Sequence, residues 1–279
     1  MRLLKFKEDR RSVVVMALVT GTLVAQWLVV AHFSPLLFAL SVILALQVAV
    51  LAHNHHHSPM WNSRALNVIT GYWLTLFYGG PAIGWLAIHN RSHHAHSNAP
   101  ELDCTSTHNV ADRNDLLGLL LYIPASMGRF VRQTHQALRA IYKKSPARFW
   151  FHVSDLAFLY GVMVILLVID WRKALLYLVV PQQVAITSIA HFNFFQHAQT
   201  DGSSKYNVSR NFVGRFLNLY LFNSGFHTVH HLAPKLHWSE APAHHARVEP
   251  MIDPRLNEPS FWAYFARVVS GRALSHADV

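Results

Sequence analysis

Histidine clusters are the part of this sequence that could carry chemistry. The chain has 21 histidines among 279 residues, and most of them stand beside long apolar runs. The four clusters occupy residues 53–57, 89–96, 191–197 and 227–231. Neutral imidazole is the commonest metal ligand in proteins. We therefore interpret the clusters as one metal site that is assembled from distant parts of the chain.

The spacing inside the clusters supports this interpretation, because side chains three or four residues apart share one face of a helix. The pairs four residues apart are His53 and His57, His89 and His93, Asn193 and His197, and Asn223 and His227. Further histidines in the same clusters are His94, His230 and His231. More imidazoles converge than one tetrahedral zinc uses, so the pattern favours two metals. Imidazole suits Fe, Zn, Cu and Ni, which leaves the identity of the metal open.

The composition indicates a membrane protein. The chain is 52% hydrophobic and 14% charged, which is too apolar for an ordinary soluble domain. Its net charge is +10, but no basic stripe with interleaved aromatic residues occurs, so we expect no nucleic-acid partner. Lysines and arginines that flank membrane spans and face anionic lipids explain the charge better. Cys104 is the only cysteine, which excludes an intramolecular disulfide and a four-cysteine iron–sulfur centre.

Four apolar runs approach the length of about 20 residues that a helix needs to cross a bilayer. They cover residues 13–33, 35–52, 150–169 and 174–190, and short turns join them into two hairpins. The second run ends on His53 and the fourth on His191. The sequence therefore predicts an all-α membrane protein of one domain, residues 1–279. Four transmembrane helices would carry a cytoplasmic helical cap with a His-rich site for two metals.

Two other apolar stretches, residues 68–88 and 116–127, are interrupted by glycine or proline. We interpret both as interfacial or partly embedded helices. Basic residues set the orientation: nine lie between the hairpins, eight follow the last span and five precede the first. Only Arg172 and Lys173 fall in the far-side turns. The positive-inside rule then places both termini and all histidine clusters in the cytoplasm. We expect a protein of a bacterial inner membrane.

The pattern resembles the integral-membrane fatty acid desaturase and hydroxylase superfamily, over about residues 13–245. The matching motifs are histidine boxes: HNHHH at residues 53–57 (first box), HNRSHH at 89–94 (second box), QH at 196–197 (QH box) and HTVHH at 227–231 (third box). The resemblance implies nine iron ligands, namely His53, His57, His89, His93, His94, His197, His227, His230 and His231. It also implies that Asn193 holds a metal-bound water. Two irons per chain would activate O₂ and abstract hydrogen from an unactivated C–H bond.

Other polar residues near the boxes are candidates for supporting the ligands. Acidic residues after the second box hydrogen-bond ligand imidazoles in related desaturases, which makes Glu101 and Asp103 candidates, although a polar loop explains them equally well. Asn223, one turn before His227, is a third candidate. The roles of four histidines stay open, namely His55, His56, His96 and His191. Further histidines are interpreted as surface or locally hydrogen-bonded residues, namely His108, His135, His237, His244 and His245.

The leading hypothesis is an O₂-dependent acyl desaturase that acts on an acyl chain linked to CoA, acyl carrier protein or a lipid. No redox domain is visible, so electrons must come from a separate ferredoxin, rubredoxin or cytochrome. Aromatic residues could line a tunnel for the chain, although such residues are more often core, namely Trp73, Phe77, Tyr78, Trp85, Phe192, Phe194 and Phe195. A hydroxylase-type monooxygenase on the same scaffold is the alternative. A His-rich membrane metal transporter would belong to another class, but it should place polar ligands near mid-membrane.

Overall fold

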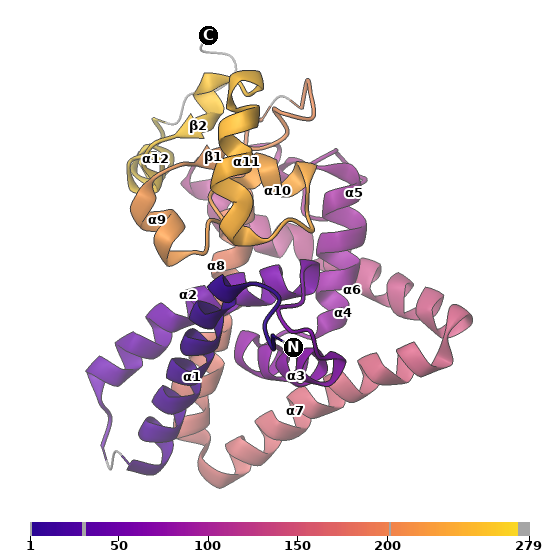
Figure 1. Ribbon diagram of the computed structural model, residues 1–279, viewed down its shortest axis with the longest axis vertical. Helices are drawn as coiled ribbons and strands as arrows, with labels where there is room; N and C mark the ends of the chain where they lie inside the picture. The colour runs from indigo at the N-terminus through magenta and orange to yellow at the C-terminus, as the bar shows by residue number, and fades with distance from the viewer. Residues whose placement is uncertain (1, 30–31, 201, 273–279) are drawn as a thin grey trace. The chain divides into compact units, whose positions relative to one another are not determined.

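The computed structural model describes residues 2–29, 32–200 and 202–272. The described chain is mostly helical and forms two compact units (Figure 1). The first unit contains the residues up to Ile83 together with Leu138–Ile189. The second contains Gly84–Ala137 together with the residues from Ala190 onward.

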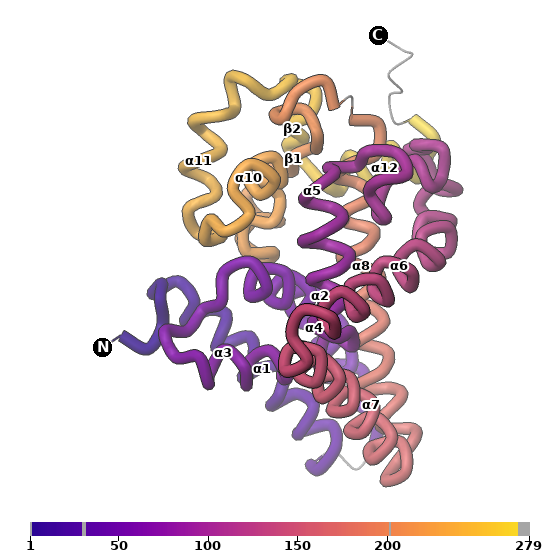
Figure 2. The backbone as a smooth tube through the Cα atoms, turned by 90° about the vertical axis from the view of Figure 1, so that its right-hand side faces the viewer, coloured from indigo at the N-terminus to yellow at the C-terminus, as the bar shows by residue number. Residues whose placement is uncertain are grey.

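The first unit begins with a helical hairpin. Its elements are η1 (Lys7–Asp9), α1 (Arg10–Val24), the π-helical turn η2 (Ala25–Val29), α2 (Pro35–His57) and α3 (Arg64–Tyr78). Val30 and Ala31, which belong to the first predicted span, lie outside the described residues. Ser34 caps α2 by accepting a hydrogen bond from Leu37, and Pro35 at the first helical position supports this start. Helices α1 and α2 pack side by side, as Figures 1 and 2 show.

The other half of this unit is one long helical segment with a break. It comprises α7 (Pro146–Ala174), the π-helical turn η5 (Leu175–Val179) and α8 (Val180–His197), whose last turns belong to the second unit. Asp170 has extended backbone angles, φ −155° and ψ 94°, inside α7. Its Oδ1 accepts hydrogen bonds of 3.1 Å from the amides of Arg172 and Lys173, as an N-cap does. The chain therefore starts a new helix after Asp170, within the predicted turn.

Three helical segments of the described chain are long and apolar enough to cross a membrane. They are Lys7–Val29, Pro35–His57 and Pro146–His197. The third has 52 residues, far more than the roughly 20 that one crossing needs, and it contains the break at Asp170. Large apolar side chains project from α7, and Val168 is 81% exposed. Lipid contact explains such exposure, whereas water would not favour it.

The stretch 68–88, whose sequence is interrupted by glycine and proline, is divided between separate helical elements. Helix α3 ends at Tyr78, and Gly79 adopts a left-handed conformation with φ 81°. A Cβ atom at Gly79 would lie 2.6 Å from the side chain of Gln182, so glycine is required there. A new helix starts at Ala82, whose amide donates to the buried carboxylate of Asp155 at 2.8 Å. Asp155 is thus an acidic residue inside a spanning segment with a structural role.

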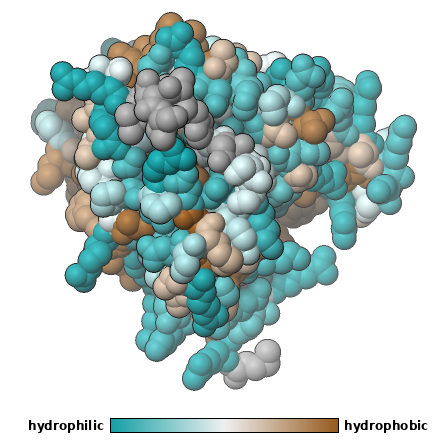
Figure 3. All heavy atoms as spheres, turned by 90° about the horizontal axis from the view of Figure 1, so that it is seen from above, coloured by the Kyte–Doolittle hydropathy of each residue, from teal (hydrophilic) through white to brown (hydrophobic). Residues whose placement is uncertain are grey.

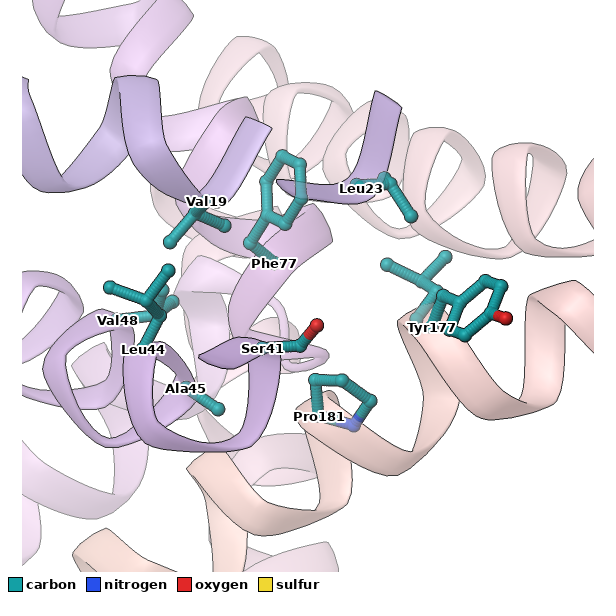
Figure 4. A pocket seen from close by; sticks show the side chains of 10 residues that line it. Val19, Leu23, Ser41, Leu44, Ala45, Val48, Phe77, Tyr177 and Pro181 are labelled. Carbon is teal, nitrogen blue, oxygen red and sulfur yellow. The ribbon is translucent and has the colours of Figure 1, made fainter. Parts of the chain in front are cut away.

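A small apolar pocket lies between the helices of the first unit (Figure 4). Its lining comes from α1, α2, α3, η5 and α8, and includes Leu44, Phe77 and Pro181. Ser41 adds a hydroxyl, which donates to the side-chain oxygen of buried Gln26 at 3.0 Å. Of the residues expected along an acyl tunnel, Phe77 is the one that lines this pocket.

The second unit carries most of the histidines. Its elements are α4 (Ala82–Gly84, shared with the first unit), the π-helix η3 (Trp85–His93), α5 (His94–His96), η4 (Thr107–Val110), α6 (Leu116–Lys144), β1 (Asn211–Phe212), α9 (Arg215–Tyr220), α10 (His227–Leu232), η6 (Trp238–Glu240), α11 (Ala241–Val248), η7 (Glu249–Met251), η8 (Pro254–Leu256), β2 (Asn257–Glu258) and α12 (Phe261–Val269). The predicted stretch 116–127 is therefore the first part of α6, a 29-residue helix that runs on past Ala137.

The core of this unit is aromatic. Phe192 and Phe195 from α8 pack against Phe212 and Phe261, with ring centroids 5.5–5.7 Å apart. These two phenylalanines therefore form core packing in the structure. Strands β1 and β2 pair in parallel, with Asn211 opposite Asn257. Hydrophilic residues cover most of the face seen in Figure 3.

Candidate metal centre

Four imidazoles from three elements meet in the second unit. His93 ends η3, His197 ends α8, and His227 and His231 lie one turn apart on α10. One ring nitrogen of each lies within 4.8 Å of those of the other three. Nε2 of His197 is 2.9 Å from Nε2 of His227 and 3.1 Å from Nε2 of His231. The last two atoms are 3.2 Å apart.

These separations fit a shared metal better than hydrogen bonds. The carbonyl of Val208, which can only accept, lies 2.8 Å from Nδ1 of His197. Nδ1 therefore carries the ring proton, and Nε2 presents a lone pair to the cluster. Two imidazole nitrogens on one metal, each about 2.0–2.1 Å from it, lie roughly 3 Å apart.

His93 provides an independent indication. Its Nδ1 lies 2.8 Å from Oδ2 of Asp103 and 2.9 Å from the hydroxyl of Thr105. Its Nε2 is buried and has no hydrogen-bond partner among the described residues. An unpaired buried polar atom costs free energy, and a metal ion would satisfy this one. Burial and the neighbouring imidazoles hold the pKa of His231 well below its usual value, so that ring is also neutral and able to ligate.

Three further imidazoles adjoin this group within the same unit. Nε2 of His89 is 3.1 Å from Nε2 of His94 and 3.4 Å from Nε2 of His230. The ring of His94 lies 5.0 Å from that of His231, centroid to centroid. Seven histidines of the second unit therefore form two neighbouring sets, each with nitrogens at ligand spacing.

A π-helix creates the contact between His89 and His94. In η3 the amide of His94 bonds to the carbonyl of His89, five residues earlier, rather than to the residue four earlier. Residues five apart then share a face, so His94 joins the predicted pair of His89 and His93, whose rings stack with centroids 5.3 Å apart. π-Helical turns are rare and occur mainly at functional sites.

The first histidine box belongs to the first unit. His53 and His57 lie one turn apart at the end of α2, with ring centroids 5.0 Å apart. His55 plays a different part, since its Nε2 lies 3.3 Å from the carbonyl of Asn67 and its Nδ1 accepts from the amide of Met60. His55 therefore fastens the loop that follows α2, which gives a role to a histidine that the sequence left open.

The loop after the second box holds His93 in place through Asp103. The side chain of Asp103 is fully buried and also accepts hydrogen bonds from the amides of Asn98 and Thr105, both 2.8 Å long. Burial alone would raise the pKa of Asp103, but the contacts with His93 and Thr105 outweigh it and hold this pKa far below its usual range. Asp103 is therefore a carboxylate that orients the imidazole of His93.

The other two candidates for supporting a ligand, Glu101 and Asn223, make different contacts from those of Asp103. The side chain of Glu101 is exposed, and its backbone carbonyl accepts from Arg129. Asn223 donates to the carbonyl of Trp238 at 3.0 Å and so ties the loop before α10 to η6. Cys104, next to Asp103, is buried, and burial raises the pKa of its thiol to about 11.

Asn193 lies half-buried one turn before His197 on α8. Its Nδ2 donates to the hydroxyl of Tyr122 at 2.8 Å. Tyr122 is a residue that sequence reasoning missed, because a tyrosine in an apolar stretch carries no signal of its own.

The remaining histidines separate into exposed and buried residues. His96 and His135 are exposed, and His237 lies 2.7 Å from the hydroxyl of Ser239 within its own turn. His191 contacts the backbone of Leu119. The interpretation of His245 as a surface residue is wrong: it is 5% exposed and packs against Phe226. The sequence of α11 could not show this, because the loop before α10 supplies the cover.

Buried polar residues position α10 and the end of α8, two of the three elements that carry the cluster. Asn211 accepts from the amide of Thr228 at 2.9 Å and so caps the start of α10. Arg210 is 6% exposed and donates to the carbonyls of Phe195 and Ala198 at the end of α8. A cation at the end of a helix binds the last carbonyls and interacts favourably with the negative end of the helix dipole. Neither residue carries a sequence motif.

Replacing Asp103 with asparagine is expected to weaken metal binding by about 10–100-fold, the usual loss when an outer partner of a ligand is removed. The amide lacks the negative charge that favours the Nδ1-protonated ring of His93. Competition with a chelator, followed by metal analysis, measures the affinity. Glu101→Gln is the matched control, since its side chain is exposed. Wild-type affinity in Asp103→Asn would contradict the orienting role.

A comparison with protein families shows the family to which this sequence belongs. The sequence model described as fatty acid desaturase matches residues 25–264, which span both units and all the histidine boxes. A comparison with curated proteins finds no significant match. The geometry agrees with the family match, because histidines from the second, third and QH boxes come together with their nitrogens at metal-ligand spacing. The chain therefore belongs to the fatty acid desaturase family.

Proposed function

We propose that the protein is a membrane-bound, O₂-dependent diiron desaturase that introduces a double bond into a fatty acyl chain. The observation that carries this proposal is the pair of adjoining imidazole sets in a chain of the desaturase family. The family match spans both compact units, which supports treating residues 1–279 as one functional domain.

The proposed ligands follow from the contacts and the resemblance together. The first set would hold one metal through His93, His197, His227 and His231. A second metal would take its ligands from His89, His94 and His230, and the resemblance adds His53 and His57. Two irons, when bound, would supply O₂ activation and removal of hydrogen from an unactivated C–H bond, which side chains cannot achieve.

The protein's own groups prepare the site for such metals. Asp103 and the carbonyl of Val208 keep protons on the Nδ1 atoms of His93 and His197, and so leave their Nε2 lone pairs for ligation. With a metal bound, Asn193, one turn before His197 on α8, would orient a metal-bound water. Burial of the Nε2 atom of His93 keeps bulk water away from this ligand position.

The membrane arrangement that we propose has four spans in two hairpins. The break at Asp170 divides the segment Pro146–His197 into two limbs, each long enough to cross. The excess of basic residues outside Arg172 and Lys173 favours a cytoplasmic location for both termini and the metal site, in a bacterial inner membrane.

A soluble electron donor and an anionic acyl carrier would both meet a basic surface. Helix α6 carries Arg132, Arg139, Lys143 and Lys144 as exposed side chains. Acidic ferredoxins, CoA phosphates, acyl carrier protein and lipid head groups are complementary to this charge. Such exposed attraction weakens with salt, because screening acts over about 8 Å near physiological ionic strength.

Reconstitution in membrane vesicles tests the reaction and the orientation together. We expect an alkene product only when O₂, a labelled acyl substrate and a reduced ferredoxin with its reductase are supplied. Turnover should occur when the donor is outside inside-out vesicles and fail with right-side-out vesicles. Mass spectrometry of the product identifies a double bond and its position.

Each departure from this result has a separate meaning. A hydroxylated product without alkene would assign the chain to the hydroxylase-type monooxygenases on the same scaffold. Turnover without added reductant would contradict the need for an external donor. Activity in right-side-out vesicles alone would reverse the proposed orientation.

A further inference from the structure

Tyr122 lies between two parts of the proposed metal site and hydrogen-bonds to both. Its side chain is 1% exposed and its ring packs 5.4 Å from that of Phe194. Its hydroxyl lies 2.5 Å from the carbonyl of Thr105, the residue whose side chain contacts His93. On its other side the hydroxyl lies 2.8 Å from Nδ2 of Asn193.

The chemistry of these two partners fixes the direction of both hydrogen bonds. A phenol has one proton, and a carbonyl can only accept, so Tyr122 donates to Thr105. Toward Asn193 the phenol oxygen can then only accept. The NH₂ group of Asn193 must therefore face Tyr122, which decides an amide orientation that is otherwise hard to assign. Burial, reinforced by the charge of Asp103, raises the pKa of Tyr122 far above its usual value, so the phenol keeps this proton.

The Oδ1 atom of Asn193 is consequently the acceptor that this side chain still offers. No described group donates a hydrogen bond to this oxygen. An oxygen acceptor matches a metal-bound water, whose lone pair points to the metal and whose hydrogens point outward. An NH₂ group in the same place would repel those hydrogens.

We propose that Tyr122 is a positioning residue that locks the amide of Asn193 with Oδ1 toward the metal edge, so that the site accepts a hydrogen bond from a bound water. This inference rests on the proposed function, because the water is expected only beside a metal. It adds Thr105 and Tyr122 to the residues that link the second box to α8.

Tyr122→Phe tests the inference, because it removes the hydroxyl and keeps the ring that packs on Phe194. The protein is loaded with Co²⁺, whose visible absorption responds to the number and arrangement of its ligands. We expect Tyr122→Phe to keep its metal content but to change this spectrum in the same way as Asn193→Ala. In the iron-loaded enzyme we expect kcat to fall roughly tenfold with little change in KM, the scale of one buried hydrogen bond.

Tyr264→Phe is the matched control. Tyr264 is 3% exposed in the same unit, and its hydroxyl donates to Oδ1 of Asn114 at 3.0 Å. This variant should keep the wild-type Co²⁺ spectrum. Because Tyr122 acts through Asn193, Tyr122→Phe combined with Asn193→Ala should be no worse than Asn193→Ala alone.

Several results would overturn the inference. A wild-type spectrum in Tyr122→Phe, or additive losses in the double variant, would show that the hydroxyl does not act through Asn193. A spectral change in Tyr122→Phe without alkene formation by the wild type would retain the inference and reject the desaturase proposal. If Tyr122→Phe does not fold, a high-resolution structure of the metal-loaded wild type decides: a metal-bound water is expected beside Oδ1 of Asn193, and its absence contradicts the lock.

Discussion

Replacing His197 with alanine is expected to halve the metal content of the purified protein and to lower turnover by more than about 100-fold. This loss exceeds the one of about 10–100-fold that follows removal of a residue that only orients a ligand. His197 is fully buried, and its Nε2 lies within 3.1 Å of two other ligand nitrogens. The remaining imidazoles cannot close the gap, because His93 is fixed by Asp103 and the helix α10, which carries His227 and His231, is fixed by Asn211. Elemental analysis and product formation measure the two effects.

His135→Ala is the control for this experiment. His135 is exposed on α6, so the variant should keep both metals and full turnover. His245 is a poorer control, because it is buried and its loss would leave a cavity. Full metal retention in His197→Ala, or equal losses in both variants, would reject the proposed division between ligands and surface histidines. Zinc in a heterologous sample would not decide the metal's identity, because zinc also binds imidazole sites well.

Gly225→Ala is expected to destabilise the second unit by at least about 3 kcal/mol, which is severe overpacking. A Cβ atom there would lie 2.1 Å from the carbonyl oxygen of Phe212 and 2.6 Å from Oδ1 of Asn218. Neither neighbour can retreat: the amide of Phe212 donates to the carbonyl of Gly225, and Oδ1 of Asn218 accepts from its amide. Gly225 stands two residues before His227, so metal content should fall as well.

Thermal unfolding measures this effect, with a midpoint lowered by roughly 6–12 °C for a chain of this size. Gly128→Ala is the matched control. Gly128 is exposed on α6, a Cβ atom added there would meet nothing within 4 Å, and alanine is the better helix former by about 1 kcal/mol. A midpoint in Gly225→Ala that equals that of Gly128→Ala would show that the loop before α10 moves freely.

The histidine boxes and apolar runs could be predicted because they are local patterns. Residues four apart on α10 or at the end of α2 share a face by helix geometry alone, as His227 and His231 do. The family resemblance, which rests on these patterns, is confirmed by the family match over residues 25–264.

The rest depended on backbone geometry and on long-range contacts. The π-helix η3 brings His89 to His94, and nothing in its sequence distinguishes it from an α-helix. The sequence offered Glu101 and Asp103 as equal candidates to support a ligand. The turns of the loop, with left-handed residues such as Asn98 and Glu101 itself, bury Asp103 and expose Glu101. Tyr122 and Arg210 donate hydrogen bonds to backbone carbonyls that are distant in the sequence. Any residue type can supply such a carbonyl, so these contacts produce no recognisable sequence pattern.

The burial of Cys104 has a consequence for the durability of the protein. Oxidants attack the thiolate rather than the thiol, and a pKa of about 11 leaves only about one thiolate in ten thousand at neutral pH. The amide of Cys104 also donates to the hydroxyl of Ser92 at 2.8 Å, and the residue is only 3% exposed. The only cysteine of the chain is thus kept in its least oxidisable form, and the loop that orients His93 carries no reactive thiolate.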